Sequence, residues 1–250
     1  MTPTSETFPG VGGAPLALHR LGSGRPVILL HGLMSTAEMN WVRYGTAATL
    51  AQAGFECLMP DLRAHGASAV PHDPAAYPPD VLAGDVAALV RHLGLSDYDL
   101  VGYSLGARTA VRAVIAELTP RRLVLGGMGW EGLTEGLRRR QFFLDAVAAF
   151  DTAKPGDPAY FAVQFMKTMD VDRTAIRLLL ETFEDTLASA IEAICTPTLV
   201  VCGVDDSDNG SASLLAAKMQ NAALVTIPGN HMSAVTKPDL GAAIRVYLQD

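Results

Sequence analysis

The sequence is poor in cysteine and has no long hydrophobic run. Its 250 residues include only Cys57, Cys195 and Cys202. This odd number, without the paired spacing of zinc ligands, argues against a disulfide framework and a metal site. No apolar run approaches the roughly 18 to 20 residues of a membrane span. The first residues, MTPTSETFPGVGG, lack the basic start and apolar stretch of a signal peptide. We therefore expect a cytoplasmic protein that does not bind membranes.

Basic residues are also few. Lysine and arginine total 19 against 26 acidic residues, which gives a formal net charge of -7. The longest run of like charge is RRR at residues 138–140. Such a chain is a poor candidate for binding nucleic acid or an anionic membrane. A small molecule is therefore the expected partner, and the sequence does not define an oligomeric state. The hydrophobic content of 49% suits a single folded core.

Short apolar runs that do not alternate recur along the chain. RPVILLHG (residues 25–32) is typical of a strand buried on both faces of a parallel sheet. Segments with apolar residues at helical spacing, such as residues 80–93, separate these runs. This alternation predicts an α/β fold with a mostly parallel central sheet flanked by helices. The other expected strands cover residues 55–61, 98–104, 121–128, 197–203 and 222–229, with an antiparallel edge strand at 14–22.

One region departs from this alternation. Between Trp130 and Ile194 the sequence predicts helices at 132–150 and 173–194 and no strand. An insertion of this length is too long for an ordinary crossover connection. We interpret residues 130–194 as a small helical cap, inserted after the strand that ends near Met128. Residues 1–129 and 195–250 would then form the core, and the whole chain one domain.

Ser104 stands at the carboxyl end of an expected strand and before an expected helix. It lies between Gly102 and Gly106, in the pattern G-x-S-x-G. Small neighbours allow a sharp strand-to-helix turn that projects the serine oxygen. The following helix directs its partly positive amino end at that oxygen. Ligands bind at this edge of open parallel sheets, so we expect Ser104 to be a nucleophile.

A serine nucleophile needs a base and a carboxylate, and the sequence places candidates for both. A serine hydroxyl is weakly nucleophilic until a base takes its proton. His231 directly follows the last expected strand and is the candidate base. The carboxylate that orients it would follow the preceding strand, where Asp205, Asp206 and Asp208 all qualify. The chain order serine, aspartate, histidine is then satisfied.

The oxygen of a tetrahedral intermediate also needs hydrogen-bond donors. One is expected to be the backbone N–H of Leu105, directly after the nucleophile, and the second the backbone N–H of Leu33, in the loop after VILLHG. Each such donor lowers the barrier by about 3 to 4 kcal/mol.

Three motifs together resemble the α/β-hydrolase superfamily over nearly the whole chain. They are HGLMST (31–36), MPDLRAHGAS (59–68) and VGYSLGA (101–107), which are similar to the oxyanion turn, the D-x-R-x-H-G-x-S loop and the nucleophile elbow of that family. The resemblance implies that the acid is Asp206, the fourth residue of G-x-x-D. In some members the acid follows the strand that ends near Met128, which leaves Glu131 as an alternative.

The same resemblance bears on two further points. It implies that Asp61, Arg63 and His65 organise the loop beside the site through hydrogen bonds and charge pairing. The family's usual G-x-G-H before the base is present here as Gly229-Asn230-His231, a small departure.

The motifs predict a carboxylesterase-like serine hydrolase, without a metal or cofactor, that cleaves a small uncharged ester through an acyl-enzyme. A serine at the elbow argues against haloalkane dehalogenases and epoxide hydrolases, which use aspartate there. Lactonases, thioesterases, carbon–carbon bond hydrolases and cofactor-free perhydrolases remain as alternatives. Some proteins of this fold act as ligand receptors, which is the alternative outside catalysis.

The cap is the expected source of substrate selectivity. Met34 and Trp130 are expected to contact the substrate, because each closely follows a core strand. The arginines at 138–140 could serve a carbon–carbon hydrolase, although a solvated helix face is the favoured interpretation. The cap phenylalanines are expected mainly to pack the cap onto the core; they are Phe142, Phe143, Phe161 and Phe165.

Overall fold

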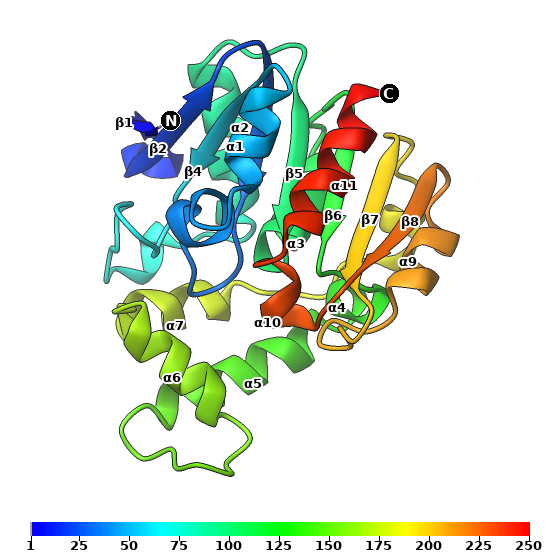
Figure 1. Ribbon diagram of the computed structural model, residues 1–250. Helices are drawn as coiled ribbons and strands as arrows, with labels where there is room; N and C mark the ends of the chain where they lie inside the picture. Colours follow the sequence, from blue (N-terminus) through cyan, green and yellow to red (C-terminus); the bar gives the residue numbers. More distant parts are fainter. Residues whose placement is uncertain (1) are drawn as a thin grey trace.

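An eight-stranded, mostly parallel sheet forms the centre of the computed structural model, which describes residues 2–250 (Figure 1). The strand order is β1-β2-β4-β3-β5-β6-β7-β8, and only the pairings of β2 with β1 and β4 are antiparallel. The α/β prediction is confirmed. The strands are β1 (Thr4–Pro9), β2 (Pro15–Gly22), β3 (Arg25–Leu30), β4 (Phe55–Pro60), β5 (Asp99–Tyr103), β6 (Leu123–Gly126), β7 (Thr198–Gly203) and β8 (Ala222–Ile227).

The first strand was not expected from the sequence. In β1 only Phe8 is buried and the other side chains are exposed, so the segment lacks the apolar pattern of a core strand. It forms by pairing along its own full length with residues 15–20 of β2 at the edge of the sheet.

Helices cover both faces of the sheet because the core strands are apolar on both sides. In β3, Val27 and Leu29 pack with α1 and α11, whereas Ile28 and Leu30 pack with α2 and α3. This alternation follows from the two-residue period of a strand. The helices outside the cap are α1 (Thr46–Gln52), α2 (Val81–His92), α3 (Leu105–Ile115), α9 (Ala212–Lys218), α10 (His231–Ala234) and α11 (Pro238–Gln249), with short turns η1 (Val11–Gly13), η2 (Glu38–Val42) and η3 (Pro74–Ala76).

The connection between β6 and β7 contains five helices and, within the described chain, no strand. They are α4 (Trp130–Thr134), α5 (Gly136–Ala148), α6 (Tyr160–Thr168), α7 (Arg173–Glu181) and α8 (Ala188–Glu192). Helices α5 to α7 project at the bottom of Figure 1. The single helix expected over 173–194 is divided, because residues 183–187 leave helical geometry. In this segment the Thr186 N–H donates to the carbonyl of Leu133, and the Asp185 carboxylate accepts from the Leu137 N–H.

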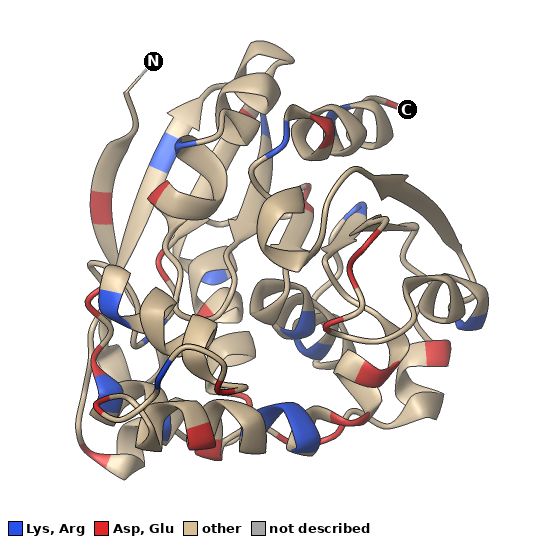
Figure 2. Cartoon of the chain, turned by 60° about the horizontal axis from the view of Figure 1, so that its bottom comes forward, with Lys and Arg blue, Asp and Glu red and all other residues tan. Residues whose placement is uncertain are grey.

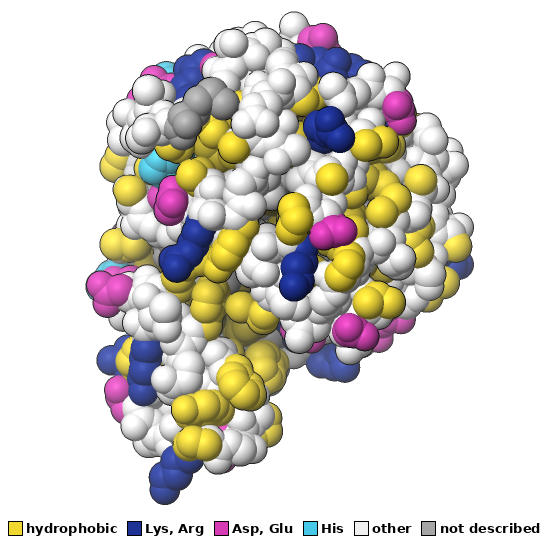
Figure 3. Space-filling view, viewed as in Figure 1, with side chains coloured by type: hydrophobic (Ala, Val, Ile, Leu, Met, Phe, Trp, Pro, Cys, Tyr) yellow, Lys and Arg dark blue, Asp and Glu magenta, His cyan; other side chains and the backbone are white. Residues whose placement is uncertain are grey.

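The surface shows where helices α5 to α7 meet the rest of the molecule. Hydrophobic side chains gather at the recess between α5–α7 and the rest of the molecule (Figure 3). Basic and acidic residues are interspersed along the chain in the view of Figure 2, without a large area of one sign. No helix among residues 2–250 combines the length and the apolar character needed to cross a membrane.

Candidate active site

Ser104 lies at a strained turn between β5 and α3. Its φ of 53° and ψ of -113° are unusual for a residue with a side chain, and such a conformation costs about 1 to 3 kcal/mol. Gly106 permits the turn, since a Cβ there would lie 2.0 Å from the carbonyl oxygen of Leu30. A Cβ on Gly102 would likewise lie 2.2 Å from the backbone of Gly106. The two glycines therefore allow the close packing that exposes the serine oxygen.

The structure brings Ser104, His231 and Asp206 together at the carboxyl edge of the sheet. The Nε2 atom of His231 lies 3.0 Å from the Oγ atom of Ser104. Its Nδ1 atom lies 2.9 Å from the Oδ2 atom of Asp206. His231 begins α10 just after β8, and Asp206 lies in the turn after β7. The three side chains thus form one continuous chain of hydrogen bonds.

Among the three candidate aspartates, only Asp206 contacts the histidine. Its side chain is 1% exposed. Burial disfavours its charge, but the hydrogen bond and charge of His231, together with the N–H of Asp208, outweigh burial and lower the pKa of Asp206. Asp205 and Asp208 are exposed. The alternative acid, Glu131, instead accepts a hydrogen bond of 2.7 Å from the N–H of Ser211.

Tyr103 and Asn230 both fix the backbone at His231, and sequence reasoning gave neither a role. The Tyr103 hydroxyl donates to the backbone carbonyl of His231 at 2.6 Å. The Asn230 side chain caps α10 by accepting from the Ser233 N–H, and Ser233 returns a bond to the Asn230 N–H. This capping box fixes the start of the helix that carries His231. The adjacency of Tyr103 to Ser104 was the only sequence signal.

The backbone N–H groups of Leu33 and Leu105 are available beside Ser104. Within residues 2–250, neither N–H donates to a protein acceptor. Both residues line a cavity that also contains Ser104. Leu105 begins α3, so its N–H belongs to the partly positive amino end of that helix. This is the arrangement of two donors that can receive a developing oxyanion.

Comparison with known proteins shows the family and the fold of the chain. Residues 25–123 match the pattern of the alpha/beta hydrolase fold family. A non-heme haloperoxidase of Rhodococcus erythropolis is 30% identical over 240 residues, covering 83% of this chain and 85% of that protein. The chain belongs to the α/β-hydrolase family. A hydrolase from Pseudomonas aeruginosa, whose crystal structure is known, is 25% identical in sequence to this α/β hydrolase. The two structures align with a TM-score of 0.75 over 99% of each chain. An esterase from a Rhodococcus species shares the fold, with 23% identity, a TM-score of 0.73 and coverage of 100% and 99%.

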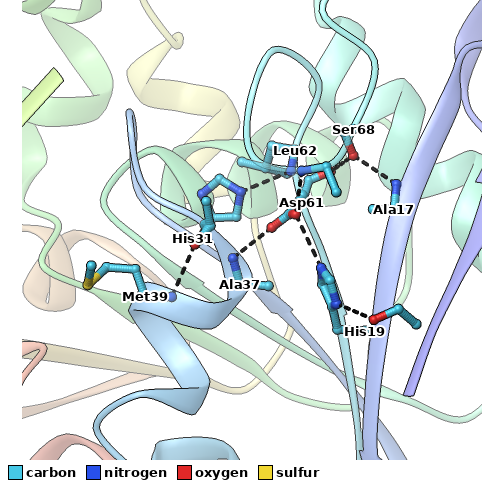
Figure 4. A network of polar contacts seen from close by, with 11 residues as sticks. Ala17, His19, His31, Ala37, Met39, Asp61, Leu62 and Ser68 are labelled. Carbon is cyan, nitrogen blue, oxygen red and sulfur yellow. Dashed lines mark hydrogen bonds and ion pairs between the residues drawn. The ribbon is translucent and has the colours of Figure 1, made fainter. Parts of the chain in front are cut away.

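In this α/β hydrolase, Asp61 fixes the loop that carries Leu33 (Figure 4). Its Oδ1 atom accepts from the Ala37 N–H at 2.8 Å, and its Oδ2 atom accepts from the Ala67 N–H at 2.9 Å. His19 Nε2 lies 3.2 Å from the same Oδ2. One buried carboxylate therefore joins the 31–37 loop to the 61–68 loop, which is the organising role expected of Asp61.

Two buried histidines complete this connection. His65 Nε2 accepts from the Met34 N–H at 2.9 Å, and His31 Nε2 accepts from the Leu62 N–H at 2.9 Å. The Nδ1 atom of His65 donates to the Arg63 carbonyl, and that of His31 donates to the Gly32 carbonyl. Because Nε2 accepts and Nδ1 donates in each ring, both rings are neutral. Burial lowers the pKa of both, that of His65 to about 3. Arg63 forms a buried bidentate pair with Asp85, with two bonds of 2.9 and 2.8 Å.

Acid is expected to destabilise the fold through His65. Its pKa of about 3 lies below the ordinary histidine pKa of 6.5, so below pH 6.5 the unfolded chain binds a proton that the folded chain does not. This difference leaves the free energy of unfolding unchanged above pH 6.5. It lowers that free energy by about 2 kcal/mol between pH 7 and pH 5. Urea unfolding of the wild type and of His65→Gln at both pH values measures this difference, which the variant should lack.

The matched control for that measurement is His92→Gln, which replaces an exposed histidine. It should keep the wild-type pH dependence. His19 makes the folded state more stable in acid, because its hydrogen bond to Asp61 raises its pKa. Its contribution is the same in the wild type and in both variants, so it cancels when their pH dependences are compared. A His65→Gln variant with the full wild-type pH dependence would contradict the prediction.

Two cavities flank Ser104 and Leu33. The larger, of about 110 Å³, includes His231, and the smaller, of about 30 Å³, includes Leu105. The side chains of the larger cavity are mostly apolar or hydroxylic, and include Met39, Tyr44, Phe165, Met232 and Thr236. The smaller cavity is lined by Arg108, Met128, Arg139, Phe143, Phe183 and Asn209, among others. The nucleophile therefore stands between two chemically different spaces.

The two residues predicted to contact substrate line neither cavity. Met34 is 2% exposed and packs in the core, where its φ of 60° turns the chain. Trp130 is partly buried against the same core, with Lys218 Nζ 5.8 Å from its ring centroid. Of the cap phenylalanines, Phe143 and Phe165 line a cavity, whereas Phe161 is 82% exposed. Following a core strand was too weak a signal for substrate contact.

Arg108 and Arg139 are site residues that sequence reasoning missed. Arg139 belongs to the run expected to be a solvated helix face, yet it is partly buried and lines the smaller cavity. Its neighbour Arg138 is the exposed member and pairs with Glu135. Arg108 offered a signal, since it is a charged residue about one helical turn after Ser104.

Proposed function

We propose that this α/β hydrolase is a serine esterase that cleaves small carboxylic esters through an acyl-enzyme. The observation that carries the proposal is the unbroken relay from Asp206 through His231 to Ser104, with contacts of 2.9 and 3.0 Å. A hydroxyl so placed can pass its proton to the imidazole as it attacks a carbonyl carbon. No group of three or more metal-ligating side chains occurs among residues 2–250. The proposed reaction uses the three relay side chains, two backbone N–H groups and water.

The proposed reaction has two halves. Ser104 Oγ attacks the ester carbonyl while His231 Nε2 takes the hydroxyl proton, and Asp206 holds the imidazolium through Nδ1. The N–H groups of Leu33 and Leu105 bind the oxyanion. Collapse of the intermediate breaks the ester C–O bond, and His231 gives its proton to the departing alkoxide. Water then attacks the acyl group, with His231 again the base, and releases the acid and free Ser104.

An acyl-enzyme predicts stoichiometric covalent chemistry at Ser104. A fluorophosphonate should label the protein once and inhibit ester hydrolysis, because its phosphorus takes the place of the carbonyl carbon. Peptide mass spectrometry should locate the adduct on Ser104. Ser233, the nearest serine to His231 in sequence, provides the internal control and should remain unlabelled. Full hydrolysis after complete labelling, or labelling elsewhere without a Ser104 adduct, would contradict the proposed function.

A further inference from the structure

Arg108 carries a charge that is nearly buried and has no carboxylate partner. The residue is 8% exposed. Its guanidinium donates to two backbone carbonyls, those of Glu184 and, at 3.5 Å, Leu133. Its Cζ atom lies 5.3 Å from the ring centroid of Phe183. Among residues 2–250 no carboxylate oxygen lies within 4.0 Å of the guanidinium, whereas the neighbouring Arg112 is paired with Asp80. A buried charge is costly unless an anion compensates it.

Arg139 approaches the same space from the cap. Its Cζ atom lies 5.1 Å from the ring of Phe143 and 5.7 Å from that of Phe142. The guanidinium makes no hydrogen bond or ion pair with residues 2–250. Asp208 and Asp206 favour its charged form from beyond 4.0 Å, while burial opposes that charge. Its five N–H donors are therefore available to a ligand.

The chain makes room for these two groups beside the nucleophile. Both line the cavity of about 30 Å³ that also contains Ser104. Gly136 lies against Arg108, since a Cβ there would be 2.5 Å from Nη1. The rest of the lining includes Met128, Phe143 and Phe183. A small cavity with apolar walls and two guanidinium groups is suited to an anion. A carboxylate fits best, because its two oxygens can accept two parallel hydrogen bonds from one guanidinium.

The position of His231 decides which part of the substrate would enter this cavity. His231 gives its proton to the leaving alcohol, so the leaving group must lie on the histidine's side of Ser104. That side is the larger cavity, which His231 lines. The acyl chain is then left with the smaller cavity, which His231 does not line. The two arginines consequently face the acyl side of the scissile bond.

We propose that Arg108 and Arg139 bind a carboxylate at the far end of the acyl chain, so that the preferred substrates are half-esters of short dicarboxylic acids. This inference rests on the proposed esterase function and narrows it. It also departs from the uncharged ester that the sequence alone suggested. The anion would place a carboxylate in direct contact with both guanidinium groups, which no acidic side chain among residues 2–250 does.

The test compares esters that differ only in this charge. Monoethyl succinate, glutarate and adipate are each paired with the ethyl ester in which the free carboxylate is replaced by a primary amide. Ethanol release gives kcat and KM. The wild type should favour at least one half-ester over its amide by tenfold or more in kcat/KM, because hydrogen bonds to charged groups are about twice as strong as neutral ones. Ethyl esters are used because aryl half-esters cleave themselves through the neighbouring carboxylate.

Two variants assign the preference to the cavity. Arg139→Gln should lower the half-ester to amide ratio by about tenfold, mainly through a higher KM for the half-ester. The matched control, Arg138→Gln, removes an exposed charge from the same helix and should keep the wild-type ratio. Arg108→Lys keeps a charge without the fork and should lower the ratio as well. We choose lysine at this position instead of glutamine, because an uncharged amide buried there would destabilise the fold.

A binding measurement separates this inference from the proposed function. Calorimetry with Ser104→Ala should detect the favoured half-ester, and Arg139→Gln in the same background should weaken its binding about tenfold. If the wild type hydrolyses half-esters and amides equally, the carboxylate site is wrong and the esterase stands. If Ser104→Ala turns over either ester at the wild-type rate, the proposed function itself is wrong.

Discussion

Replacement of Ser104 by alanine is expected to lower kcat for ester hydrolysis by about 10⁴-fold or more. The change removes the nucleophile of the first half-reaction, since Nε2 of His231 lies 3.0 Å from Ser104 Oγ. The N–H groups of Leu33 and Leu105 would remain, so a small residual rate above that of free water is expected. Release of 4-nitrophenol from a short-chain ester measures the loss.

The fold should survive this change, which makes the lost rate interpretable. Alanine keeps the Cβ that already tolerates a φ of 53°, so the thermal midpoint should stay close to that of the wild type. Ser104→Gly should be equally inactive and unfold at a higher temperature, because glycine relieves the strain of that conformation. Ser213→Ala, at an exposed position on α9, is the matched control. Substantial turnover by folded Ser104→Ala would end the proposal of an acyl-enzyme at this residue.

The parts of the site that the sequence predicted are those set by local pattern. The strand that ends before Ser104 is fully buried and mostly apolar. Its flanking glycine Gly106 is required because a Cβ there would lie 2.0 Å from the carbonyl oxygen of Leu30. Both signals lie within a few residues of the serine. Likewise, His231 follows the last strand directly, and parallel strands bring their carboxyl ends to one edge. Chain order and strand ends were therefore enough to predict that Ser104 and His231 lie side by side.

The parts that the sequence did not predict depend on angles between elements. Arg138 and Arg139 are adjacent in sequence and differ by about 100° around α5, which places one in solvent and the other in the cavity. That rotation is set by how α5 packs against α6 and α7, and no local pattern encodes it. Met34 lines neither cavity for a different, local reason. It follows a core strand, but its left-handed φ turns the side chain into the core.

The choice of acid was only partly predictable from local pattern. The residues alone allowed Asp205, Asp206 and Asp208, because all three occupy one loop after β7. The Asp206 N–H donates to the Gly203 carbonyl at 3.0 Å, and this turn directs its side chain at His231 while Asp205 stays exposed. The distance in sequence from the end of β7 thus decides which aspartate faces His231. The G-x-x-D pattern of the family specifies that distance, which is why the resemblance selected Asp206.

Asp206→Asn is the second change expected to have a large effect. Asparagine keeps the shape of the side chain, but its amide can donate to Nδ1 and stabilise the tautomer whose Nε2 carries the proton. Such a histidine cannot accept the proton of Ser104, and kcat should fall by about 10³- to 10⁴-fold. The loss should appear in kcat more than in KM, because Asp206 acts on the histidine and does not line either cavity beside Ser104.

Two further variants make the Asp206→Asn result specific to this carboxylate. Asp205→Asn removes an exposed neighbouring charge and should change kcat less than twofold, so a general loss of negative charge would not explain the effect. Glu131→Gln tests the alternative acid, whose Oε2 is occupied by the Ser211 N–H. If Glu131→Gln lost as much activity as Asp206→Asn, the relay would have to reach His231 from the loop after β6. The contact of 2.9 Å between Asp206 Oδ2 and His231 Nδ1 predicts the opposite order, with Asp206→Asn lower than both controls by at least two orders of magnitude.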